Sequence, residues 1–107
     1  METTKLILKP LNGTNYATWK VQCRMALIKE GLWSIVNRTE LISNDASREQ
    51  KEKFVLRKDK ALATIVLSVE PKWLYILGSD PCDPTEVWQK LADHFQKKSW
   101  ANKLSLR

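Results

Sequence analysis

Apolar residues recur every three or four positions along most of this chain. That spacing places side chains on one face of an α-helix, and glycines, prolines or a polar loop over residues 37–45 separate the segments that show it. The predicted helical segments, long and short, are residues 15–30, 31–36, 46–69 and 84–98, and residues 71–77 form a further short apolar element that Gly78 ends. The pattern therefore predicts an all-α fold, a compact bundle of about four to six helices.

The first predicted helix carries two apolar rows. One row contains Tyr16, Trp19, Cys23, Ala26 and Leu27, and the other contains Ala17, Val21, Met25 and Ile28. A surface helix needs only one such row to pack on a core. The second row indicates either a central helix that is buried on all sides or a face that meets a partner.

Residues that favour helix ends refine these boundaries. Candidate caps for the first helix and for the helix over 46–69 are Thr14, Asn15, Ser43, Asn44 and Asp45. The clearest signal precedes residue 87, where Asp83 can cap a helix, Pro84 suits its first position and Glu86 completes a capping-box pattern. We expect that helix to end near Lys98 and Ser99 to cap another.

The expected organisation has three parts. Residues 1–13 form an N-terminal arm, residues 14–98 form the helical domain, and residues 99–107 begin a following helix that is cut off. A chain of 107 residues is long enough for one domain with a real core. Its 43% hydrophobic content argues against disorder, and its five tryptophans indicate a core built around large rings. We expect Trp19, Trp33 and Trp88 to be core rings, since each lies on an apolar row or in an apolar cluster.

Composition weakens several functional classes. The chain has no apolar run long enough to span a membrane and no signal-peptide pattern at its N-terminus. Its two cysteines, Cys23 and Cys82, are too few for a disulfide framework, and His94 is the single histidine. We therefore expect a cytoplasmic protein that is not an enzyme, binds no cofactor or metal and has no membrane partner. Cys23 is expected in the core, and His94 is expected to be partly exposed.

A net charge of +6 leaves two interpretations open. Basic proteins favour polyanions such as RNA, but the same charge can simply keep a surface solvated. The charged first half of the helix over 46–69 is interrupted by acidic residues, which favours a solvated face. The segment after Asp93 has no acidic residue and combines basic with aromatic side chains. Its candidate nucleic-acid contacts are Lys97, Lys98, Trp100, Lys103 and Arg107.

Three separate segments together resemble a known family. Residues 11–19 follow the pattern Leu-x-Gly-x-Asn-Tyr-x-x-Trp, which is similar to the opening motif of Gag proteins of copia-type LTR retrotransposons. Residues 31–33 resemble the next landmark of that family, and residues 83–95 resemble its tryptophan-containing helix. The residues that carry the resemblance are Leu11, Gly13, Asn15, Tyr16, Trp19, Gly31, Trp33, Asp83, Pro84, Val87, Trp88, Leu91 and Phe95.

The resemblance implies a domain like the N-terminal lobe of a retroviral capsid. Members of the family self-associate into virus-like particles that package the element's RNA, so the expected partners are other copies of the chain and RNA, bound weakly and without sequence specificity. The family's zinc knuckle has no counterpart in residues 1–107. Candidate self-association residues are Val21, Met25, Ile28, Trp100 and Leu104. The alternative is a basic nucleic-acid-binding module with no role in assembly.

Overall fold

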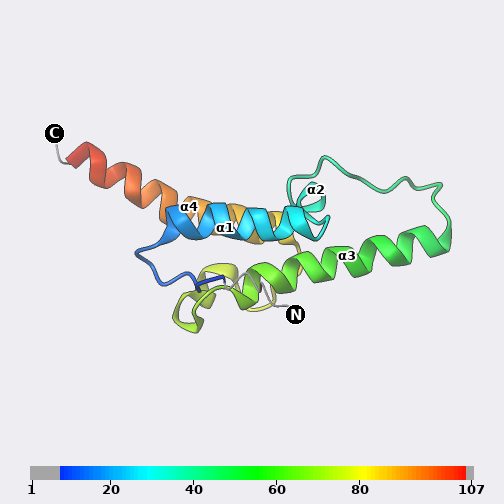
Figure 1. The fold of residues 1–107 in the computed structure, drawn as a ribbon, viewed down its shortest axis with the longest axis horizontal. Helices are drawn as coiled ribbons and strands as arrows, with labels where there is room; N and C mark the ends of the chain where they lie inside the picture. Colours follow the sequence, from blue (N-terminus) through cyan, green and yellow to red (C-terminus); the bar gives the residue numbers. More distant parts are fainter. Residues whose placement is uncertain (1–7, 106–107) are drawn as a thin grey trace, which may run out of the picture.

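The part of the chain that the structure describes is mostly helical. The computed structural model describes the backbone of residues 8–105 and the side chains of residues 8–96. The helices follow one another as α1 (Tyr16–Lys29), α2 (Trp33–Val36), α3 (Arg48–Leu67), the 3-10 helix η1 (Pro71–Leu77) and α4 (Pro84–Ser105) (Figure 1). The predicted all-α bundle is confirmed.

The helix boundaries agree with the sequence pattern at most positions and differ at the caps. α3 begins after Ser47, whose hydroxyl accepts from the Gln50 backbone N–H at 3.1 Å while the Gln50 side chain accepts from the Ser47 N–H at 2.9 Å. This reciprocal capping box stabilises the start of the helix. The prediction that Ser43, Asn44 or Asp45 caps α3 is therefore wrong.

The other two predicted caps are partly confirmed. Asp83 caps α4, because its Oδ1 accepts from the Thr85 backbone N–H at 3.0 Å. Glu86 forms no capping box; its carboxylate lies 3.9 Å from Lys90 Nζ, one turn along. Asn15 occupies the N-cap position of α1, but its side chain bonds backward to Asn12 N and Pro10 O. That side chain stabilises the turn before α1 instead of capping the helix.

α4 is longer than the sequence pattern predicts. It runs without a break from Pro84 to Ser105, so the predicted end near Lys98 and the new helix after Ser99 are wrong. No glycine or proline follows Pro84 in the sequence, and therefore nothing local forces the helix to stop. The division into an arm, a domain and a cut-off helix stays a prediction.

The core forms where α1, α3 and α4 pack together. Trp19, Leu27, Ile65 and Leu91 are fully buried in it. Trp19 stacks on Trp88, their ring centroids 5.6 Å apart. Aromatic residues that lie far apart in the sequence therefore share one cluster, which is large enough to dominate the energetics of a small domain.

Two of the predicted core tryptophans lie at the edge of this cluster. Trp33 and Trp88 are only partly buried, although both pack on the core and meet edge to face at 5.2 Å. Tyr16 and Phe95 stack at 5.5 Å on the same cluster. All three tryptophans are predicted to be core rings, but of these three only Trp19 is fully buried.

The end of α3 is tied to the segment before α1 through one carbonyl. The Ser68 carbonyl oxygen accepts from the Leu11 backbone N–H at 2.8 Å and from Trp19 Nε1 at 3.1 Å. The Glu70 N–H in turn donates to the Leu11 carbonyl at 3.1 Å, which completes an isolated parallel β-bridge between Leu11 and Val69. These bonds satisfy buried polar groups that would otherwise lack partners at the helix end.

Two features of position 13 require a glycine: its backbone conformation and its close contact with Trp73. Its φ is +97°, in the region that side chains disfavour, and a Cβ added there would overlap the indole of Trp73. Gly31 also has a positive φ, +73°, but an added Cβ there would meet nothing within 4 Å.

We predict that Gly13→Ala destabilises the protein by about 2–4 kcal/mol, because it adds a clash with Trp73 to the backbone strain. Gly31→Ala is the matched control and carries the strain alone, about 1–2 kcal/mol. Urea unfolding of both variants measures the difference. Equal losses in the two variants would show that the contact between Gly13 and Trp73 contributes nothing to stability.

Candidate functional site

The outer side of α1 presents an apolar row to solvent. Val21, Met25 and Ile28 are 49%, 46% and 47% exposed, whereas Trp19, Cys23 and Leu27 on the inner side are fully buried. The first row predicted from the sequence is therefore the core row, and the second is exposed. The alternative in which α1 is buried on all sides is wrong. We call Val21, Met25 and Ile28 the α1 face.

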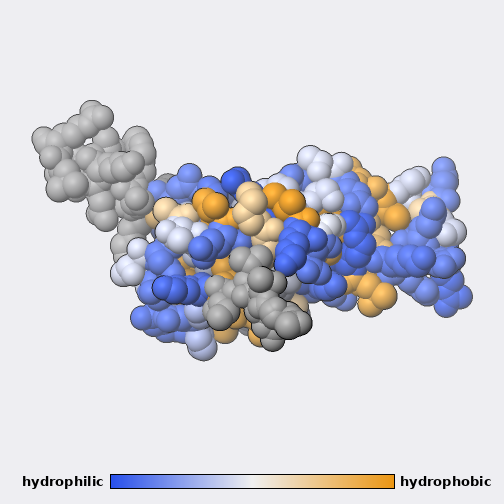
Figure 2. Space-filling view, viewed as in Figure 1, coloured by the Kyte–Doolittle hydropathy of each residue, from blue (hydrophilic) through white to orange (hydrophobic). Residues whose placement is uncertain are grey.

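The α1 face is bordered by basic residues. Hydrophobic side chains follow the line of α1 across the surface of the molecule in Figure 2, among hydrophilic ones. Arg24 and Lys29 lie beside the face on α1, and among the described residues neither of them forms an ion pair. An apolar row with a basic border is a feature of helices that bind partners or anionic surfaces.

A second group of exposed apolar residues lies on α3. The first half of this helix extends past the ends of α1 and α4 (Figure 1). Leu56 is 68% exposed and Val55 is 52% exposed, and Leu67 near the other end is 82% exposed. Leu56, Ala63 and Leu67 follow one another on the side of α3 opposite buried Ala61 and Ile65. We call Leu56, Ala63 and Leu67 the α3 face.

Sequence reasoning missed the α3 face, although its signal was present. The apolar spacing i, i+7, i+11 from Leu56 to Leu67 marks a second row on α3. This row is less obvious than the inner one because charged residues interrupt it, among them Asp59 and Lys60.

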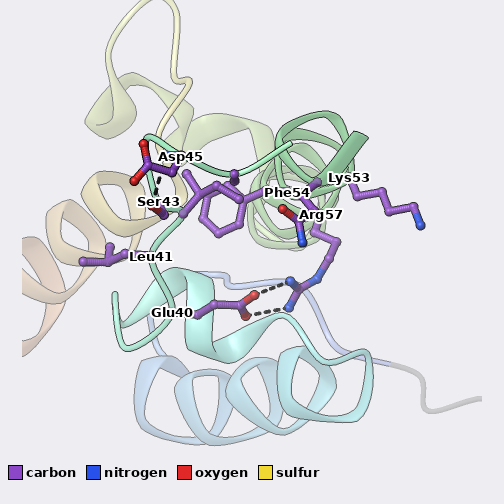
Figure 3. A pocket seen from close by; sticks show the side chains of 10 residues that line it. Glu40, Leu41, Ser43, Asp45, Lys53, Phe54 and Arg57 are labelled. Carbon is purple, nitrogen blue, oxygen red and sulfur yellow. Dashed lines mark hydrogen bonds and ion pairs between the residues drawn. The ribbon is translucent and has the colours of Figure 1, made fainter. Parts of the chain in front are cut away.

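A cleft of about 500 Å³ lies between α3 and the loop over residues 40–46. Figure 3 shows Glu40 and Arg57 facing each other across it. Arg57 donates to both Glu40 carboxylate oxygens, at 2.6 and 2.8 Å, and to the Gly31 carbonyl at 2.7 Å. Ser34 Oγ donates to the same carboxylate at 2.8 Å. Glu40 and Arg57 are therefore bonded to each other, whereas Asp45 and Lys53, which also line the cleft, take no part in this pair.

These bonds shift the acid–base equilibrium of Glu40. The hydrogen bonds from Arg57 and then Ser34 lower the pKa of Glu40 from its usual 4.5 to about 2, and partial burial opposes the shift. The same bonds raise the pKa of Arg57. We call this ion pair and its hydrogen bonds the Glu40–Arg57 clasp; it holds the loop after α2 to α3. No sequence pattern predicts this ion pair, because the two residues belong to no periodic row.

Two side chains that could act as nucleophiles, Cys23 and Tyr16, pack in or against the core. Burial raises the pKa of the Cys23 thiol to about 11, and a hydrogen bond with Ser68 partly opposes the shift. Burial, together with the Asp93 charge, raises the pKa of Tyr16 to about 12. Cys23 lies in the core as predicted, and Cys82 is exposed. A nucleophile needs the opposite environment for its thiol.

His94 also has a structural position. It is partly exposed, as predicted, and packs against Phe95 at 4.7 Å and Trp73 at 5.8 Å between ring centroids. Among residues 8–96, no three His, Cys, Asp or Glu side chains lie close enough together to hold a metal ion.

None of the helices in the described part of the chain is both long and apolar enough to cross a membrane.

The residues of the family resemblance build the fold, and the structure brings their three segments together. Leu11, Trp19, Pro84, Val87, Leu91 and Phe95 are buried, whereas Gly13, Asn15, Tyr16, Trp33, Asp83 and Trp88 are partly buried and Gly31 is exposed at the turn after α1. Thr85 adds a direct link, because its hydroxyl donates to the Val36 carbonyl at 2.6 Å and so joins α4 to the end of α2. These residues therefore position the α1 face without being part of it.

The predicted nucleic-acid contacts lie outside the described residues: the side chains of Lys97, Lys98, Trp100 and Lys103, and Arg107 entirely. The side chain of Leu104, a predicted self-association residue, also lies outside them. On the charged part of α3, Lys53 lies 3.4 Å from Glu49, and Lys60 lies 3.4 Å from Glu30 at the end of α1. Such exposed pairs agree with the prediction of a solvated face there.

Comparison with known proteins gives one match. A family model described as a domain of unknown function (DUF4219) matches residues 11–37, which include α1, α2 and the turn before α1. The matched segment holds two of the three segments of the resemblance, over 11–19 and 31–33. No curated protein and no solved structure matches the chain.

We predict that the Glu40–Arg57 clasp stabilises the protein above about pH 4.5 and that its contribution is lost as the pH falls toward 2. The pKa of Glu40 is lower in the folded protein than its usual value, so protonation favours unfolding. Both side chains are more than a third exposed, at 38% and 39%, so solvent screening limits the contribution to about 1 kcal/mol.

Urea unfolding of Glu40→Gln at neutral pH and at about pH 2.5 measures this contribution. The variant should be less stable than the wild type at neutral pH, and the two should converge in acid. Glu52→Gln, at an exposed pair on α3, is the control for the loss of one carboxylate. A stability difference for Glu40→Gln that does not change with pH would contradict the prediction.

Proposed function

We propose that this chain is a structural Gag-type protein of a copia-like retrotransposon, or of a host gene derived from one. In this proposal it adopts a capsid-like fold and self-associates through helical surfaces into virus-like particles that package RNA. The support comes from the three segments of the resemblance, from the all-helical fold and from the match over residues 11–37 to a domain that occurs in plant retrotransposon Gag-like proteins.

One observation carries the proposal, namely that α1 is apolar on both sides. Its inner side is fixed in the core by Trp19, and its outer side exposes Val21, Met25 and Ile28. Exposed apolar residues that occur singly need no explanation, but a continuous row on one helix is typical of an interaction surface. Covering this row would remove apolar area from water at roughly 25 cal/mol per Å².

The size of the α1 face indicates how such an assembly would be held together. A stable two-protein interface buries about 800 Å² on each partner, which is much more than three half-exposed side chains can supply. Each contact through the α1 face would therefore be weak by itself. Particles would form because every copy takes part in several contacts, so that the overall binding strength multiplies.

We predict that the protein self-associates in a concentration-dependent way and that Met25→Asp weakens this association about tenfold or more. The charge would have to be buried in the contact without a partner. Gln22→Asp is the matched control, because Gln22 is exposed on the same helix about a quarter of a turn from the α1 face. Light scattering across a concentration series measures the mass of each protein.

A wild type that stays monomeric at all concentrations, with and without RNA, would contradict the proposal. A Gln22→Asp variant that loses association as strongly as Met25→Asp would remove the α1 face from it. Thermal melting of all three proteins shows whether either substitution disturbs the fold.

The second candidate function is a basic nucleic-acid-binding module, which the net charge of +6 favours. Binding would be electrostatic, so the affinity for single-stranded RNA should fall with salt, with a slope of about −0.7 per phosphate contacted. Charge reversal at Lys97, Lys98 and Lys103 should weaken it more than reversal at Lys51 and Lys53. RNA binding that is steeply salt-dependent, by a protein that never self-associates, would favour this candidate over the first.

A further inference from the structure

We propose that the α1 face of one copy docks on the α3 face of the next copy, so that the chain assembles head to tail. This inference rests on the proposed self-association and adds the identity of the two contacting surfaces. The faces belong to different helices that turn their buried sides to one shared core. Their exposed sides therefore point away from that core. Figure 1 shows α1 and α3 at separate positions in the fold.

The basic residues beside the α1 face favour a contact with a different face over a contact with a second α1 face. The α1 face is bordered by Arg24 and Lys29, and no ion pair among the described residues uses either of them. Two α1 faces brought together would place these cations against their own copies. Like charges facing each other across an interface cost affinity, so the basic border disfavours a symmetric α1 contact.

The α3 face offers the complementary charge. Glu52 and Asp59 lie on one side of the line of Leu56, Ala63 and Leu67, and Asp59 takes part in no ion pair among the described residues. Lys60 lies on the other side of that line, and its charge is already paired with Glu30 at the end of α1, 3.4 Å from its Nζ. The carboxylate of Glu52 lies 3.3 Å from Arg48 Nε on the exposed surface. Surface pairs of this kind contribute little and exchange easily, so both acidic side chains can face the cations of another copy.

The α1 face is short enough to fit within the length of the α3 face. At 1.5 Å per residue, the α1 face spans about 10 Å from Val21 to Ile28, and the α3 face spans about 16 Å from Leu56 to Leu67. Ala63 leaves a shallow position between the two leucines of the α3 face, which suits the long flexible side chain of Met25.

The symmetry of such a contact has a direct consequence. A contact between two different surfaces uses only one of them on each copy, so the other stays free for a further copy. Head-to-tail docking therefore produces open chains or rings, whereas a symmetric contact stops at a dimer.

A mixing experiment tests this inference. Met25→Asp removes the α1 face and leaves the α3 face intact, while Leu56→Asp does the reverse. We expect each variant alone to stay monomeric at concentrations where the wild type associates. An equal mixture should form a one-to-one dimer and grow no further, because only one working pair of surfaces remains. Light scattering reads the mass, and circular dichroism confirms that both variants are folded.

Other outcomes overturn the inference in recognisable ways. If Leu56→Asp alone dimerises, the contact is symmetric through α1; if Met25→Asp alone dimerises, it is symmetric through α3. A mixture that remains monomeric rules out direct docking of one face on the other. If both variants still assemble like the wild type, the inference fails while the proposed self-association stands, whereas a monomeric wild type defeats both.

A charge swap tests the same contact without placing a charge at its apolar centre. Arg24→Glu and Asp59→Lys should each weaken association about threefold to tenfold. A chain that carries R24E and D59K together should recover most of the loss, because the exchanged charges meet between copies. No recovery in the double variant would count against the pairing of these two faces.

Discussion

The Ser68 carbonyl at the end of α3 is the point on which the rest of the structure depends. It accepts from the Leu11 backbone N–H and from the Trp19 indole, so one buried acceptor joins the segment before α1, α1 itself and α3. Removing either donor would leave the buried Ser68 carbonyl oxygen with one hydrogen bond fewer, and this loss would lower the stability of the folded protein. This constraint explains why Leu11 and Trp19, the first and last residues of the opening motif, are both fully buried.

This arrangement also decides which side of α1 is free. With Trp19, Cys23 and Leu27 held inside, the helix cannot rotate, and its other apolar row must face solvent. Trp88 stacks on Trp19 from α4 and closes the inner side further. The motif residues and the exposed face therefore have different roles on one helix: the first set orients α1, and the second set is available for contact.

The sequence predicted the helices well because apolar periodicity is a local property. It predicted the cap of α3 poorly because several polar residues precede that helix, although the Ser47 and Gln50 pair fits the capping-box spacing. The exposure of the α1 face was not predictable, since two apolar rows do not reveal how many neighbours a helix has. The Glu40–Arg57 clasp depends on the path of the loop after α2, and apolar periodicity does not predict the path of a loop.

The most direct test of this account uses the methionines. The chain has two, Met1 and Met25, so labelled methionine methyl groups give a simple NMR spectrum that Met25→Leu assigns. A soluble paramagnetic agent should relax the Met25 methyl strongly in dilute protein, where the α1 face is exposed, and progressively less as the protein associates. Relaxation of Met25 that stays constant while the particle mass grows would contradict the assignment of α1 as the contact surface.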